Sequence, residues 1–390
     1  MLIAVSVYGK DKPGIVHSIA NVLAENNINI VDIEQTVLQG MFTMFLVADT
    51  SKATTSFEEI KKKLENVARK IDVAISVSQF EGKHAGEKNL YVVTVLGKDR
   101  VGIVRDVTSV FLEFGINIEK TSLTARDNLI SIEFVIDIGK TNPEEVKRRL
   151  RLEAERLGLD IVFQPYSTFK RDKRLIVFDM DSTLVDAEII DELAKEAGVE
   201  REVKELTEKA MKGEISFKEA LEERVKLLKG LPAEVLEKIY SKIKLTNGAK
   251  ELIKSLKDAG YKIAVISGGF SYFTNRLKEE LGLDYAFGNE LEIIDGKLTG
   301  RLKGRIIDAE EKARIVEEIA KKEGIKLEDV VAIGDGANDK IMIEKAGLGI
   351  AFNAKEALKE VADGSISKEN LIGLASILKL PSEFKKRCNI

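Results

Sequence analysis

The stretch RLIVFDMDSTLVDAE, residues 174–188, decides the fold of the second half of the chain. Its LIVF portion is a short apolar run without alternation, which is typical of a strand buried on both faces of a parallel sheet. Asp179 and Asp181 follow directly, so two carboxylates stand at the carboxyl end of that strand. Ligands bind at this edge of open α/β sheets. The stretch therefore predicts a Rossmann-like α/β domain with an acidic site at the sheet edge.

Two aspartates at such an edge suit phosphoryl chemistry. One carboxylate can attack phosphorus to form an acyl phosphate, and the other can protonate the leaving oxygen and later deprotonate water. Two close carboxylates repel each other, so we expect a hard cation among them, and magnesium prefers few carboxylates plus phosphate oxygens. A calcium-binding EF-hand loop starting at Asp179 is excluded, because Leu184 and Ile190 occupy its glycine and glutamate positions. Taken alone, the D-x-D pattern also fits an ordinary structural turn.

A second buried strand is expected in GYKIAVISGGF, residues 260–270, ending at Ser267. Two glycines and a helix follow. A hydroxyl and free backbone N–H groups at a helix start can hold a phosphate. Ser267 does not read as a nucleophile, because no G-x-S-x-G pattern surrounds it, and an ordinary helix cap is the alternative role.

A third buried strand is expected in DVVAIGDGAND, residues 329–339, which brings Asp335 and Asp339 to the same edge. The helix DAEEKARIVEEIAKKEG, residues 308–324, precedes it and carries Lys312 near its start. Lys312 can neutralise phosphate charge, although alone it is one of many surface lysines. GDGAND is no dinucleotide fingerprint, since an aspartate replaces the last glycine of G-x-G-x-x-G.

In this order, the four segments resemble the haloacid-dehalogenase superfamily over about residues 173–385. The resemblance implies that Asp179 is the nucleophile and Asp181 the general acid and base, with Ser267 and Lys312 in the catalytic set. It implies a magnesium ion held by Asp179, the main-chain carbonyl of Asp181, and Asp335. Asp339 would then hold the metal's waters or Lys312.

The insert at about residues 186–245 is too long for a loop and has helical apolar spacing, so we expect a small helical cap. Within it, Glu188 can pair with an ammonium group and Arg224 can hold a carboxylate bidentately. Charged residues on a cap helix are otherwise usually a solvated face. Nearby, EIIDGKLTG (292–300) predicts a hairpin with an Asp-Gly turn.

Four stretches, residues 179–198, 210–232, 265–270 and 332–342, also resemble the phosphoserine phosphatase family within that superfamily. This resemblance implies hydrolysis of O-phosphoserine to serine and phosphate, the last step of serine biosynthesis. The implied substrate-binding residues are Glu188, Arg224, Met211, Phe217, Ser267, Gly268, Gly269, Asn338 and Asp339. Three alternatives stay open: phosphoryl transfer from phosphoserine to an alcohol such as homoserine, a phosphatase of another small metabolite, and a non-catalytic regulator built on the same fold.

The first 165 residues contain an internal repeat. VSVYGKDKPGIVHSIANVLAENNINIVDIEQT (5–36) and VTVLGKDRVGIVRDVTSVFLEFGINIEKTSLT (93–124) share 14 of 32 positions. Each copy continues in the order expected for a ferredoxin-like βαββαβ unit. EGKHAGEKN (81–89) is the expected linker. We therefore expect domains at 1–80 and 89–167, before a catalytic domain at 173–390.

The repeat resembles the ACT domain, a regulatory module that commonly binds amino acids, and GKDKPGIV carries the match best. In each copy, a glycine lets backbone N–H groups approach a carboxylate, an aspartate can meet an ammonium group, and an asparagine begins the next strand. These residue types also favour plain turns. The candidate effector residues are Asp11, Gly14, Asn29, Asp99, Gly102 and Asn117. The resemblance also implies a homodimer and an amino-acid effector such as serine.

The composition limits the partners. A net charge of -4 lacks the basic footprint of a nucleic-acid binder. The single cysteine, Cys388, allows no intrachain disulfide, which suits a reducing compartment. No apolar run reaches the roughly 18 residues of a membrane span, and the N-terminal apolar run is too short for a signal peptide. We therefore expect a cytoplasmic enzyme without a membrane partner.

Overall fold

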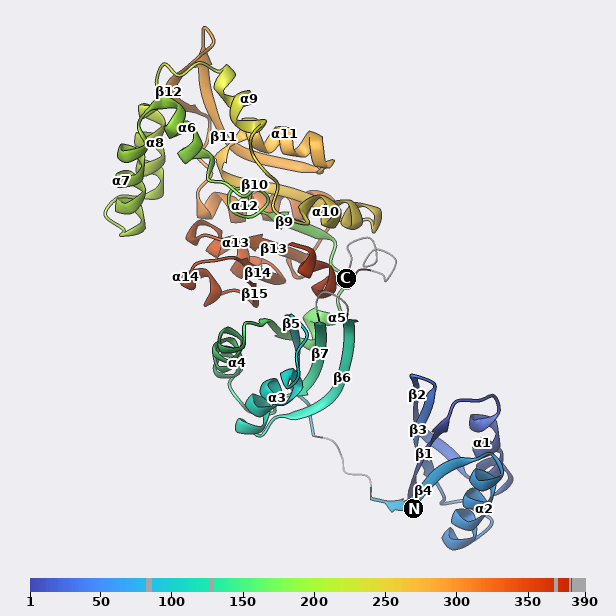
Figure 1. Ribbon diagram of the computed structural model, residues 1–390. Coiled ribbons are helices and arrows are strands. Elements are labelled where there is room, and N and C mark those ends of the chain that lie inside the picture. Colours follow the sequence, from blue (N-terminus) through green and yellow to red (C-terminus); the bar gives the residue numbers. More distant parts are fainter. Residues whose placement is uncertain (82–85, 127–129, 368–370, 379, 381–390) are drawn as a thin grey trace. The chain divides into compact units, whose positions relative to one another are not determined.

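The structure is a computed structural model that describes residues 1–81, 86–126, 130–367, 371–378 and 380. The chain divides into two compact units, Met1–Glu87 and Lys88–Ile390 (Figure 1). The expected linker at 81–89 lies partly, and Cys388 lies wholly, outside the described residues. No helix within the described ranges is long and apolar enough to cross a bilayer.

The first unit is an antiparallel four-stranded sheet with two helices packed on it (Figure 1). Alternating residues of the first strand, such as Val5 and Val7, are buried beneath the helices, as the two-residue period of a strand requires. The spatial order β2-β3-β1-β4 confirms the ferredoxin-like prediction. In chain order the elements are β1 (Leu2–Lys10), α1 (Ile15–Glu25), β2 (Asn29–Leu38), β3 (Met41–Asp49), α2 (Phe57–Lys70) and β4 (Val73–Phe80).

The second unit begins with the other copy of the repeat. Its main helix starts at an Asn142 cap followed by Pro143, and ends at Gly158 with φ 62°, so local sequence sets both ends. The elements are β5 (Leu90–Gly97), α3 (Ile103–Glu113), β6 (Asn117–Arg126), β7 (Ile130–Asp137), α4 (Pro143–Leu157) and β8 (Asp160–Pro165). The short helix α5 (Tyr166–Lys170) leads onward.

The α/β domain that follows has a mainly parallel sheet with helices on both faces. Along its central strand, Ile176 and Phe178 pack with one set of helices, while Leu175 and Val177 pack with the other. This alternation confirms a strand buried on both faces. The strands are β9 (Leu175–Phe178), β10 (Lys262–Phe270), β11 (Tyr285–Ile294), β12 (Lys297–Lys303), β13 (Val330–Gly334), β14 (Leu348–Phe352) and β15 (Gly364–Ile366).

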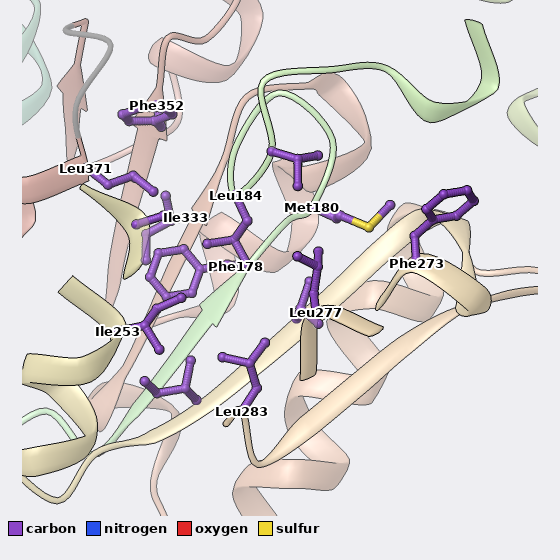
Figure 2. Close-up of a cluster of buried hydrophobic side chains, with 14 of the residues drawn as sticks. Phe178, Met180, Leu184, Ile253, Phe273, Leu277, Leu283, Ile333, Phe352 and Leu371 are labelled. Carbon is purple, nitrogen blue, oxygen red and sulfur yellow. The ribbon is translucent and has the colours of Figure 1, made fainter. Parts of the chain in front are cut away.

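The larger core lies between this sheet and one helical layer. Figure 2 shows Phe178, Leu184 and Ile333 within it, together with Leu277 from a covering helix. The flanking helices are α10 (Ala249–Asp258), α11 (Ser271–Leu281), α12 (Ala309–Glu323), α13 (Lys340–Lys345), α14 (Glu356–Lys359) and α15 (Leu374–Ile377). Short 3₁₀ turns occupy Leu327–Asp329, Ala337–Asp339 and Leu371–Gly373.

Four helices inserted between β9 and β10 form a cap: α6 (Ile189–Ala197), α7 (Glu200–Met211), α8 (Phe217–Leu227) and α9 (Glu234–Tyr240). The hairpin β11–β12 turns at Asp295 and Gly296, whose φ values of 49° and 72° fit the predicted Asp-Gly turn. One expectation was wrong. Strand β10 does not end at Ser267 but continues to Phe270, with a register shift against β11 between Ile266 and Phe270.

The second repeat and the α/β domain share one continuous sheet. Among the described strands the order is β12-β11-β10-β9-β13-β14-β15-β8-β5-β7-β6. The join is the antiparallel pair β15–β8, where Gly364 stands opposite Val162. A Cβ on Gly364 would lie 2.5 Å from a Val162 methyl carbon, so only glycine allows this approach. The β8 edge, which an open ferredoxin-like sheet would expose, is thus covered by the α/β domain.

Candidate active site

Parallel strands bring the acidic residues of separate segments together. Asp179 follows β9, and its backbone N–H donates to Ile333 O of neighbouring β13 at 2.9 Å. Asp335 and Asp339 follow β13 in the adjacent loop. Oxygens of Asp179, Asp335 and Asp339 lie within 4.8 Å of one another. The side-chain donor set is therefore entirely carboxylate, which is the kind that hard divalent cations prefer.

Lys312 of α12 is fully buried between two of these carboxylates. Its Nζ donates to Asp179 Oδ1 at 2.6 Å and to Asp339 Oδ1 at 2.7 Å. The other oxygen of Asp339 accepts from the backbone N–H groups of Asp335 and Gly336, each at 3.2 Å. Asp339 is thus committed to bonds within the chain, whereas Asp335 keeps its carboxylate toward the cavity.

Asp181 lies at the centre of a second hydrogen-bond group. Its Oδ1 accepts from the backbone N–H of Ile189 at 2.9 Å, and its Oδ2 accepts from the Ser267 hydroxyl at 3.0 Å. Ser267 Oγ in turn accepts from the Gly269 N–H at 2.8 Å. Ser182, next to Asp181, holds φ at 54°, a strained value for a serine that the surrounding bonds must fix.

Burial and mutual repulsion shift the protonation of these groups. The pKa of Asp179 is raised well above its ordinary value by desolvation and by the charge of Asp339. Desolvation and Glu188 raise the pKa of Asp181 to about 6, while desolvation and Asp339 raise that of Asp335 to about 7. Desolvation alone would lower the pKa of Lys312, but Asp179 and Asp339 outweigh it and the pKa is raised. Two like charges held this close favour a bound cation.

The cap closes over the acidic cluster and forms a cavity of ≈ 550 Å³. Phe217 of α8 lies against the carboxyl end of strand β10, because a Cβ on Gly268 would be 3.0 Å from the phenylalanine ring. This volume fits a small-molecule site. The expected residues that line it are Asp179, Asp181, Glu188, Met211, Phe217, Arg224, Gly268, Gly269, Asp335 and Asn338, whereas Ser267, Lys312 and Asp339 lie buried behind this lining.

Arg224 is the buried cation of the cap. Its Nε donates to Ala220 O at 3.2 Å, and Nη1 donates to Thr207 Oγ1 at 3.3 Å. Among the described residues it forms no salt bridge within 4.0 Å, and desolvation lowers its pKa. A buried guanidinium without a carboxylate partner is costly unless a ligand supplies one. Glu188, which accepts from Ser182 Oγ at 2.8 Å, lines the same cavity.

The sequence pattern of the haloacid dehalogenase-like hydrolases matches residues 173–347, and that of the ACT domain matches residues 1–78 and 89–164. A phosphoserine phosphatase from Archaeoglobus fulgidus is 73% identical over 347 residues, covering 89% of this chain and 100% of that protein. This chain belongs to the phosphoserine phosphatase family. The membership confirms the family resemblance seen in the four motif segments.

Two solved structures are similar to this chain. One, a phospho-aspartyl intermediate analogue of phosphoserine phosphatase, is 56% identical with a TM-score of 0.50, covering 54% of this chain and 99% of that one. The other, a haloacid-dehalogenase-family hydrolase from Salmonella enterica serovar Typhi, is 29% identical with a TM-score of 0.66, covering 74% of this chain and 99% of that one. The α/β fold prediction is confirmed.

Sequence reasoning missed several pocket residues of this family member. Thr207 anchors Arg224, and Lys355 lines the cavity from the loop before α14. Neither has a signal in the sequence, because a single threonine or lysine in a polar segment is ordinary. The remaining unanticipated lining residues are Ile190, Ala210, Leu221, Phe270, Ala309, Gly336, Ala337 and Ala357.

The two ACT domains differ at their candidate effector loops. Gly14 and Gly102 both adopt left-handed conformations, with φ values of 94° and 98°, directly before α1 and α3. In the second domain, Arg105 Nη2 lies 3.3 Å from the position of a Cβ on Gly102. At Gly14, none of the described residues beyond its two chain neighbours has an atom within 4 Å of that position. The first loop is therefore the more open of the two.

The other candidate effector residues also have defined places. The backbone N–H of Asp11 donates to Gly40 O at 2.9 Å, and Asn29 begins β2. The Asn117 side chain donates to Glu119 Oε1 at 2.9 Å at the start of β6, and Asp99 precedes the second loop.

Proposed function

We propose that this chain hydrolyses O-phosphoserine to serine and phosphate through an aspartyl-phosphate on Asp179. The observation that carries the proposal is the buried Arg224, which lacks a carboxylate partner among the described residues and lines the same cavity as the acidic cluster. A ligand with a phosphate at one end and a carboxylate at the other satisfies both. The names of the relatives point to the same substrate.

In the first half-reaction, an oxygen of the Asp179 carboxylate attacks phosphorus, and the bond between phosphorus and the serine oxygen breaks. Asp181, whose pKa is raised to about 6, gives its proton to the leaving serine oxygen. In the second, Asp181 takes a proton from water, and the water oxygen attacks phosphorus to release phosphate and restore Asp179. Ser267 holds Asp181 in place through the 3.0 Å hydrogen bond.

We propose magnesium as the cofactor, held by Asp179, Asp335 and the main-chain carbonyl of Asp181. The carboxylate cluster fits such an ion. Asp339 is left out of the proposed ligands because it is already bonded to Lys312 and to two backbone N–H groups. When bound, the ion would offset the negative charge of the transferring phosphoryl group. Lys312 adds a fixed positive charge beside Asp179 from within the chain.

Substrate selection is assigned to the cap. Arg224 would bind the serine carboxylate, and Glu188 would bind its ammonium group. Gly268, Gly269 and Asn338 would contact the phosphate end, with Met211 and Phe217 closing the apolar side of the cavity. Ser267 and Asp339 would act from behind this surface, on Asp181 and Lys312 respectively.

Release of phosphate from a panel of phosphorylated metabolites tests the function directly. Phosphoserine should be turned over fastest, chelation should abolish the signal, and magnesium should restore it. Homoserine added as a competing alcohol separates hydrolysis from transfer, since a phosphotransferase would form phosphohomoserine. Phosphoserine turnover no faster than that of unrelated phosphomonoesters would remove the proposal.

We further propose that an amino acid, serine in the first instance, binds the ACT domains, and that the enzyme is a cytoplasmic homodimer. The open loop around Gly14 supports the first domain as an effector site. Calorimetric titration of the full chain with serine and with a control amino acid tests effector binding, and sedimentation velocity tests the dimer. Equal responses to the two amino acids, or a monomer at micromolar concentration, would contradict them.

A further inference from the structure

The second ACT domain contacts the catalytic domain through one face of α4. Lys147, Arg151 and Glu155 are spaced four residues apart, so they share that face. We call these three residues the α4 contact face. Lys147 Nζ donates to Val361 O at 3.4 Å, Arg151 pairs with Glu356 at 2.8 Å, and Glu155 pairs with Lys359 at 3.8 Å. The whole face therefore meets α14 and the residues after it.

The contact is anchored by the shared sheet. The backbone N–H of Phe163 donates to Asp363 O at 2.8 Å. The buried Asp160 accepts from the backbone N–H of Ser367 at 2.8 Å and from its hydroxyl at 2.5 Å. These bonds join β8 to β15, so α14 is held between a fixed sheet join and the α4 contact face.

The residue directly before α14 lines the catalytic cavity. The backbone N–H of Lys355 donates to Asp335 O at 3.3 Å, and its Nζ lies 3.9 Å from Met211 Sδ of the cap. Lys355 thus spans from the acidic loop to the cap at the edge of the cavity, and Ala357 of α14 lines it as well. Glu356, which Arg151 holds, is the next residue along the chain.

The charge of the cavity indicates what Lys355 could bind. Four lining side chains are acidic: Asp179, Asp181, Glu188 and Asp335. Within the described lining, Arg224 and Lys355 are the cationic side chains, and Arg224 is buried inside the cap. A phosphomonoester with a carboxylate is a polyanion, so an exposed ammonium at the edge favours its capture.

We propose that Lys355 is a further substrate-binding residue, and that the second ACT domain positions it through the Arg151–Glu356 ion pair. Arg151 is a positioning residue that acts through Glu356 and not on the substrate itself. The inference rests on the proposed phosphoserine activity. A change in the second ACT domain would alter KM through this ion pair and Lys355.

Steady-state kinetics of the full chain with phosphoserine tests the route. Lys355→Ala should raise KM about fivefold, the size of a partly exposed ion contact of ~1 kcal/mol, and leave kcat within about twofold. Lys355→Arg should keep KM near the wild-type value because it retains the charge. Arg151→Ala should raise KM about two- to threefold, a fraction of the same contact. Arg148→Ala, an exposed arginine on the same helix, should change neither constant.

Two double variants distinguish a positioning role of Arg151 from general damage to the fold. Arg151→Ala added to Lys355→Ala should raise KM no further, because both act on one contact. The charge swap Arg151→Glu with Glu356→Arg should restore KM toward wild type. An unchanged KM in either single variant, full additivity in the double variant, or no recovery in the swap would overturn the inference. A wild-type chain that does not turn over phosphoserine would instead overturn the proposed function.

Discussion

Lys312 Nζ lies 2.6 Å from Asp179 Oδ1, and both side chains are buried. The lysine makes a second ion pair with Asp339 at 2.7 Å, so two carboxylates share one cation inside the fold. A buried charge that loses its partner is strongly destabilising, because it has been removed from water without compensation. Lys312 therefore contributes to the stability of the fold, and in the proposed mechanism it also places a positive charge beside Asp179.

Lys312→Met should destabilise the metal-free protein by about 3–5 kcal/mol at pH 8, as expected for breaking a buried ion pair. The loss should shrink as the pH falls, because protonation of Asp179 removes one of the unpaired charges. Urea unfolding followed by circular dichroism measures both effects. Lys321→Met, an exposed position on the same helix, is the control, and equal unfolding midpoints for the two variants would contradict this role.

Asp179→Asn should remove turnover of phosphoserine by more than about 10⁴-fold, the scale on which loss of a catalytic nucleophile acts. The amide cannot form the aspartyl-phosphate, so the phosphorylated peptide should also vanish from mass spectra of acid-quenched enzyme. Asp186→Asn is the matched control, since that aspartate is exposed in the same loop. Turnover or labelling that persists in Asp179→Asn would place the covalent step elsewhere.

Asp181→Asn should slow phosphoserine turnover by about 10²–10⁴-fold, the range of general acid–base catalysis. p-Nitrophenyl phosphate has a leaving group that needs no proton, so its first half-reaction should largely survive. Rapid mixing should then show a burst of p-nitrophenol followed by slow hydrolysis of the aspartyl-phosphate. A proportional loss with both substrates, without a burst, would argue against Asp181 as the proton donor.

Metal-free protein should become more stable as the pH falls from 8 to 5. The pKa values of about 7 for Asp335 and about 6 for Asp181 lie above the ordinary value of 3.8, so the folded state binds protons that the unfolded state releases. Magnesium competes with those protons, so the rise in Tm that it causes should be largest at pH 8 and shrink towards pH 5.

Scanning calorimetry with magnesium and with chelator at each pH isolates this difference in Tm. The titration of groups remote from the site affects both measurements equally and cancels in the difference. Asp335→Asn should flatten the pH dependence of the difference. A magnesium effect that grows as the pH falls would contradict the proposed carboxylate ligands.

Arg224→Ala should raise KM for phosphoserine by about tenfold or more, the cost of losing a charge-assisted contact of about 1.5–3 kcal/mol. Phosphoethanolamine lacks the carboxylate, so its KM should barely change, and the preference between the two substrates should disappear. Arg224→Lys should recover only part of the preference for phosphoserine, because lysine cannot form the bidentate contact of a guanidinium. A parallel rise in KM for both substrates would point to general cap damage.

The sequence by itself determined the acidic centre. Asp179 and Asp335 each come at the end of an apolar run, and Asp339 lies in the same loop as Asp335. Parallel strands end at one sheet edge, so the meeting of these residues followed from strand type. The repeat likewise determined the βαββαβ order of both ACT domains, because each strand and helix has its own local period. The Asp295–Gly296 turn was readable for the same reason, since its conformation depends on two adjacent residues.

Only the tertiary structure decided which distant surfaces meet. The pairing of β8 with β15 joins residues about 200 positions apart, and no local pattern marks either strand as the other's neighbour. Thr207 against Arg224, and Arg151 against Glu356, likewise depend on how whole helices pack. Local periodicity predicts which face of a helix or strand is buried. Which other element covers that face depends on how the whole chain packs.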